Sequence, residues 1–108
     1  MAWFVLIIAG LFEVAFAFCL GKAKDAFGTA ALGWYSAFGA CAVISFLLLN
    51  RSLHHIPIGT AYAVWTGIGA VGTAALGIMV FGDPSSFWRL FFLTTLVGSV
   101  IGLKFVAN

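Results

Sequence analysis

Charged residues divide the chain into long segments that are almost purely apolar or small. The first of these, between Met1 and Lys22, contains one charged side chain, Glu13. The later segments contain none, and they separate Asp25 from Arg51, Arg51 from Asp83, and Arg89 from Lys104. A helix that crosses a membrane needs about 20 mostly apolar residues. The pattern therefore predicts four transmembrane helices, over residues 2–20, 29–49, 57–81 and 85–106.

The connections between these predicted helices are short. Pro57 suits the first turn of the third helix, where its missing N–H costs nothing. The run Gly82-Asp83-Pro84 predicts a break before the fourth helix. None of the connections is long enough to hold a soluble domain. We therefore expect a single four-helix transmembrane domain over residues 1–108.

Composition supports an all-α integral membrane protein surrounded by the lipid bilayer. Of the 108 residues, 64% are hydrophobic and only 7% are charged, against about 25% charged in an ordinary soluble domain. The net charge of +2 includes no basic stretch that would neutralise phosphates, so nucleic-acid binding is not expected. Cys19 and Cys41 fall inside predicted helices without the spacing of metal ligands. The sequence predicts no metal site, no cofactor and no enzyme active site.

The charges that flank the helices give little preference for one orientation. Lys22, Lys24 and Arg89 lie on one predicted side of the membrane, and Arg51 and Lys104 lie on the other with the amino terminus. An excess of Lys and Arg normally marks the cytoplasmic side. Because the two sides differ by about one charge, we expect insertion in both orientations.

Glycines indicate close contacts between helices. Gly98 and Gly102 form a GxxxG pair, which lets two membrane helices approach each other closely. Gly67 and Gly69 lie near the middle of the third helix, where they serve either as a bend or hinge or as plain packing positions. Together these glycines favour a dimer or a larger oligomer.

Glu13 lies in the middle of the first predicted helix and is the main functional candidate. An ionisable residue inside a membrane is costly, and it usually faces the protein interior and marks a transport pathway or a proton relay. The nearest cations, Lys22 and Lys104, belong to helix ends and can extend away toward water. Gly10 and Ala17 share the face of Glu13 and leave room beside it. An unpaired carboxylate in this place suits the exchange of a proton for a cationic solute; a protonated strut is the structural alternative.

Three further polar or aromatic side chains complete a predicted cation site. Tyr62 and Trp65 share a face of the third helix, and Ser45 is a hydroxyl in the middle of the second. Aromatic faces attract cations, and hydroxyls can orient a carboxylate or accept N–H groups. Taken singly, the aromatic residues also fit a packing role, and Ser45 also fits a hydrogen bond to its own helix.

These residues occur in segments that resemble the small multidrug resistance family over nearly the whole chain. Ala9–Val14 (AGLFEV) is similar to the first-helix motif, and Ile56–Ala70 (IPIGTAYAVWTGIGA) is very similar to the third-helix motif. Ile101–Lys104 (IGLK) is similar to the end of the fourth helix in the guanidinium-exporter subtype. Single residues that fit this subtype better than the broad multidrug exporters are Gly10, Ala17, Ala63 and Lys104.

The resemblance implies an antiparallel, dual-topology homodimer in the bacterial cytoplasmic (inner) membrane. It implies a proton-coupled antiporter that exports guanidinium or small guanidinyl cations, with protons and substrate competing for Glu13 beside Ser45, Tyr62 and Trp65. The guanidinium exporters are expected to have a Trp where this chain has Phe16. One hydrogen-bond donor is therefore lost from the site, which bears on the substrate more than on the mechanism.

Two other functions fit the sequence. One is a broad exporter of quaternary ammonium and aromatic cations, which depends more on deformable aromatic walls and is compatible with Phe16. The other is a non-transporting membrane subunit that pairs with a second, homologous chain.

Overall fold

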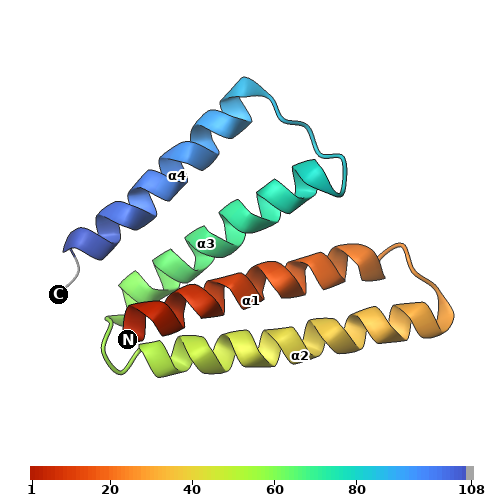
Figure 1. The fold of residues 1–108 in the computed structure, drawn as a ribbon, viewed down its shortest axis with the longest axis horizontal. Helices are drawn as coiled ribbons and strands as arrows, with labels where there is room; N and C mark the ends of the chain where they lie inside the picture. The colour runs from red at the N-terminus through yellow and green to blue at the C-terminus, as the bar shows by residue number, and fades with distance from the viewer. Residues whose placement is uncertain (107–108) are drawn as a thin grey trace.

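The computed structural model describes residues 1–106, and its four helices contain most of them (Figure 1). Each helix is long and apolar enough to cross a membrane. Residues 107–108, the last two of the predicted domain, lie outside the described part of the chain. The helices are α1 (Ala2–Ala23), α2 (Gly28–Ser52), α3 (Ile58–Met79) and α4 (Phe87–Val106). The described residues are thus all-α, without a strand.

The helices do not begin and end where the apolar segments do. α1 continues past residue 20 to Ala23 and includes Lys22, because a charged residue ends an apolar run without ending a run of backbone hydrogen bonds. Pro57 has extended geometry (φ −55°, ψ 142°) and is the N-cap residue of α3, one position before the first turn in which it was predicted. α3 ends at Met79, and Gly82, with φ of 72°, then reverses the chain.

α1 and α2 form an antiparallel hairpin (Figure 1), and aromatic pairs between them involve Phe16 and Phe18 of α1. The turn between them uses Gly28 at φ 62°, a conformation that glycine adopts at no steric cost. The rings of Phe18 and Trp34 lie 5.9 Å apart, edge to face. The hairpin therefore fixes the depth of α1 residues relative to α2 residues, including the depth of Glu13.

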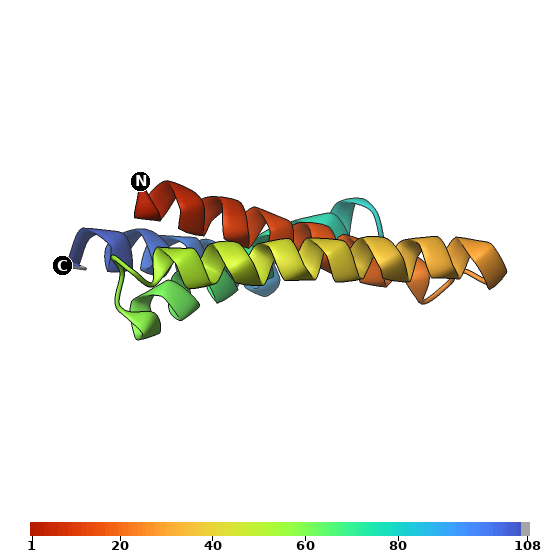
Figure 2. The same cartoon turned by 90° about the horizontal axis from the view of Figure 1, so that it is seen from below.

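α3 packs against α1, whereas the backbone of α4 lies close only to that of α3 among the described helices. At the α3–α4 contact, Val100 occupies the space where a Cβ of Gly67 would be. No residue of α4 is buried. The molecule is a thin slab of 48 × 35 × 17 Å, as the view along its edge shows (Figure 2). A single chain therefore leaves broad helix faces uncovered.

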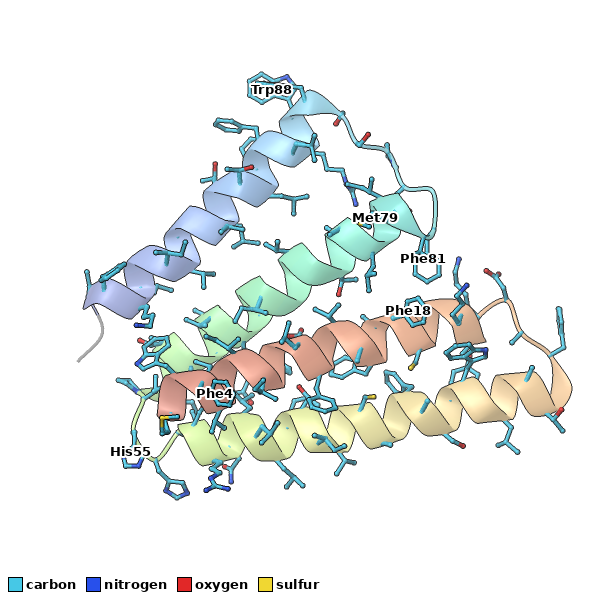
Figure 3. The ribbon with its side chains drawn as sticks, viewed as in Figure 1. Phe4, Phe18, His55, Met79, Phe81 and Trp88 are labelled. Atoms are coloured by element: carbon cyan, nitrogen blue, oxygen red, sulfur yellow. The ribbon has the colours of Figure 1, made fainter. Side chains whose placement is uncertain are left out.

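The connection from α3 to α4 is held by polar contacts at the end of α3. The Asp83 backbone N–H donates to the Gly77 carbonyl over 2.9 Å and so satisfies one of the last carbonyls of α3. The Asp83 carboxylate lies 3.8 Å from the Arg89 guanidinium. Nearby, Phe81 lies against Phe18 of α1, with ring centroids 6.0 Å apart (Figure 3). These contacts attach the α3–α4 connection to the end of α3 and to the last turns of α1.

Candidate functional site

The carboxylate of Glu13 lies against the backbone of α3 at Gly69. A Cβ at position 69 would overlap the Glu13 carboxyl group, so only glycine leaves the carboxylate in this place. Glu13 is half-buried, and its Oε1 atom is shielded from solvent without a hydrogen-bond partner among residues 1–106. An unpaired buried carboxyl oxygen is costly, and a proton or a cation at this oxygen would remove the cost.

Ser45 joins three helices through one hydroxyl group. Its Oγ donates to the Ala9 carbonyl of α1 over 2.7 Å and accepts the indole N–H of Trp65 over 3.0 Å. Ser45 is fully buried. The Ser45 hydroxyl therefore donates to another helix and not to a carbonyl of its own helix. The Ala9 carbonyl lies one helical turn before Glu13 on α1, so the same contact positions the carboxylate.

Aromatic rings surround Trp65 and extend toward α1. Tyr62 meets the Trp65 ring edge to face at 5.8 Å, and Phe46 lies 5.1 Å from it. Phe46 in turn stacks on Phe16 at 6.4 Å, which also meets Phe38 at 5.6 Å. Trp65 is buried, whereas Tyr62 is 44% exposed in the single chain. The result is a wall of aromatic faces shared by α1, α2 and α3.

The other predicted lining residues take different positions. Gly10 is buried, and the side chain of Ile68 occupies the space where its Cβ would be. Ala17 is half-buried one turn after Glu13. Ala63 is exposed, on a different face of α3 from the buried Trp65. The structure thus brings Gly10 and Ala17 to the face of Glu13 and leaves Ala63 on the outside of a single chain, and their part in a substrate site stays a prediction.

No cation among the described residues forms an ion pair with Glu13. Lys22 Nζ lies over the Phe18 ring, 5.7 Å from its centroid. Lys104 Nζ lies over the Trp3 ring at 5.6 Å. Both ammonium groups thus stay at helix ends, and the carboxylate is free to serve a mobile cation.

Sequence reasoning missed three contributors to this site. Phe46 and the Ala9 carbonyl had no signal, because an apolar residue or a backbone carbonyl in a uniformly apolar helix looks like any other. Gly69 was predicted as a hinge or packing position, but its direct contact with Glu13 depends on how α3 crosses α1, which no local pattern encodes.

Comparison with known proteins identifies the family. Residues 1–96 match the model of the family described as Small Multidrug Resistance protein. The chain belongs to this family. It is 44% identical to the guanidinium exporter of Salmonella typhimurium strain LT2 over 108 residues, all of both chains. It is 41% identical to the guanidinium exporter of Proteus vulgaris over 104 residues, 96% of this chain and 97% of that one.

Membership in the small multidrug resistance family makes the chain a membrane transporter with four membrane-spanning helices. The family predicted from the first- and third-helix motifs is therefore confirmed. The relatives are named guanidinium exporters, which agrees with the subtype that the end of the fourth helix resembles.

Replacing Ser45 by Ala is expected to destabilise the fold. The variant leaves the Trp65 N–H buried without its acceptor, which costs about 1–3 kcal/mol. Unfolding in detergent, followed by circular dichroism, would measure the loss. Thr94→Ala is the matched control, because the Thr94 hydroxyl is exposed and donates only to Leu90 of its own helix. Equal stability of the two variants would contradict the proposed role of the Ser45 hydroxyl.

Proposed function

We propose that this chain is a proton-coupled antiporter that exports guanidinium or small guanidinyl cations across a bacterial inner membrane. The observation that supports this most is the Glu13 carboxylate, which is held mid-membrane with a shielded oxygen that has no hydrogen-bond partner among residues 1–106. Relatives that are 41–44% identical to this chain are named guanidinium exporters, which supports the choice of cation.

Competition between two ligands at one carboxylate is sufficient for coupling. A planar guanidinium donates two parallel hydrogen bonds to a carboxylate, as an Arg side chain does. A proton on the same carboxylate removes both its charge and one acceptor. Guanidinium arriving from the cytoplasm displaces protons from Glu13, and protons arriving from outside displace guanidinium. No second site is required for exchange.

The proposed working unit is an antiparallel homodimer with two Glu13 side chains facing one chamber. The thin single chain supports this, since Tyr62 is 44% exposed beside the buried Trp65. Gly98 and Gly102 have no other atom within 4 Å of where a Cβ would be, so their face of α4 is open to a second copy. The near-equal numbers of Lys and Arg on the two membrane faces support insertion in both orientations.

Bending of α3 is the proposed means of changing access. Gly67 touches Val100 of α4 and Gly69 touches Glu13 of α1. A change of backbone angle between these two glycines would therefore shift α4 and the surroundings of the carboxylate in one movement.

Guanidinium-evoked current from purified protein in proteoliposomes tests the proposal. Exchange of one guanidinium for two protons, one on each Glu13 of the proposed dimer, moves one net charge, so a gradient of guanidinium is expected to evoke a current. Acidifying the side that contains guanidinium is expected to reduce this current through competition. Protein-free liposomes are the control. The absence of both a current and a guanidinium-driven pH change, with folded, dimeric protein, would reject guanidinium as the substrate.

Export of quaternary ammonium cations is the second candidate, and Phe16 favours it. The Phe16 ring packs with Phe38 and Phe46, which gives an apolar wall without an indole donor. Phe16→Trp is expected to raise guanidinium transport relative to quaternary ammonium transport several-fold, because an added N–H can hold the Glu13 carboxylate in place. The ratio of the two substrate-evoked currents measures this. An unchanged ratio would show that Phe16 does not set specificity.

A further inference from the structure

One groove of the molecule does not contain the candidate site. It has a volume of about 480 Å³ and lies over α3 between α1 and α4. Glu13, Ser45, Tyr62 and Trp65 are absent from its walls, which are apolar throughout, so Lys104 lines the groove with the apolar part of its side chain. One end of the groove is formed by Trp3 and Lys104, which contact each other through the ring and the ammonium group.

We propose that this groove binds one acyl chain of an anionic phospholipid, with the lipid phosphate at Lys104. The proposal commits to a lipid because the groove pairs an apolar channel with a single terminal cation. No ion pair of Lys104 with an acidic side chain exists among residues 1–106, so its charge is available to a phosphate. A Lys or Arg near the membrane surface contributes about 1 kcal/mol to the binding of anionic lipid.

The position and length of the groove match one leaflet. Lys104 lies in the last turn of α4, and Trp and Lys at helix ends typically lie at the headgroup level. Along α1, the groove extends from Trp3 to Val14, which at 1.5 Å per residue is about 16 Å. This is about half of the ~30 Å hydrocarbon core of a bilayer. An acyl chain whose headgroup is at Lys104 therefore ends where the groove ends.

The face of α4 that contains Gly98 and Gly102, proposed above for dimer contact, is not the face that lines the groove. Val97 and Ile101 line the groove, and Gly98 and Gly102 lie about 100° farther around the helix from them. A second copy docked on the glycines would thus meet a face of α4 next to the groove and not the groove itself. Because Gly67 also lines the groove, a bound acyl chain would contact α3 at the place where bending is proposed.

Native mass spectrometry of the delipidated dimer in neutral detergent tests the proposal. The probes are phosphatidylglycerol and phosphatidylcholine with identical acyl chains. The wild type is expected to prefer phosphatidylglycerol. Lys104→Gln is expected to reduce that preference roughly fivefold, the equivalent of one surface charge, and Lys104→Arg is expected to keep it. Lys24→Gln is the matched control: it removes the same charge from an exposed side chain at the opposite face and is expected to change nothing.

Val97→Phe tests the groove itself, because Val97 is 39% exposed along its wall and a ring there would fill the channel. It is expected to reduce the binding of both lipids while the dimer persists. Several results would overturn the proposal: equal binding of the two lipids by the wild type, equal effects of Lys24→Gln and Lys104→Gln, or undiminished lipid binding by Val97→Phe. Loss of the dimer in Val97→Phe, with no lipid preference in the wild type, would assign the groove to a second copy instead.

Discussion

Replacing Glu13 by Gln is expected to reduce guanidinium-evoked current to roughly a hundredth of the wild-type value or less. The amide keeps the size of the side chain but removes the charge that pairs with the cation and the group that takes up the proton. Losing one partner of a desolvated ion pair costs about 3 kcal/mol or more, and every 1.4 kcal/mol is about a factor of ten. Proteoliposome currents over a range of guanidinium concentrations would measure the loss.

Asp25→Asn is the matched control for this variant. It neutralises a carboxylate whose side chain is 77% exposed at a membrane face, and it is expected to leave the current unchanged. A current above a tenth of the wild-type value in the Glu13→Gln protein would show that the carboxylate is not the coupling group. The structural alternative, a protonated strut, predicts that result with stability unchanged, because the Gln amide resembles a protonated carboxyl group in size and in hydrogen bonding.

Replacing Gly69 by Ala is expected to reduce transport by about ten- to a hundredfold while the protein still folds. The added methyl group would overlap the carboxyl end of Glu13. Because that end is the tip of a flexible side chain, it can move aside at small cost to the fold, but the carboxylate then leaves its place. A displacement of about 1 Å in a reacting or binding group can cost a factor of about 100.

Gly39→Ala is the matched control for Gly69→Ala. Position 39 is also inside a helix, but no other atom lies within 4 Å of where its Cβ would be. It is expected to transport like the wild type. Equal transport by the two variants, with equal elution volumes on gel filtration, would mean that Gly69 does not position Glu13.

The sequence was a good guide to the number of helices and to the family, because both depend on local patterns. The spacing of charged residues identifies four spans, and the run from Ile56 to Ala70 has the motif of the family. The helix ends were less predictable. A Lys such as Lys22 marks where the apolar run stops, whereas the helix continues to Ala23 because its backbone hydrogen bonds do not depend on hydropathy.

The contacts within the candidate site depend on tertiary packing, and here the sequence was a poorer guide. From the sequence, the Ser45 hydroxyl could donate a hydrogen bond either to its own helix or to another helix. Only the crossing of α1 and α2 decides between the two. The contact of Glu13 with Gly69 depends similarly on the crossing of α1 and α3. In a chain that is apolar on every side, helical periodicity does not tell which face meets which neighbour.

The hydrogen bond between Trp65 and Ser45 also has a spectroscopic consequence. Indole emission responds to polarity and to hydrogen bonding at its N–H, and Trp65 is only 8% exposed among rings and one hydroxyl. Trp3, Trp34 and Trp88 lie near helix ends, away from this hydroxyl. A chain in which those three are replaced by Phe has a single fluorophore in the candidate site, so its emission reports on substrate and proton occupancy without any attached dye.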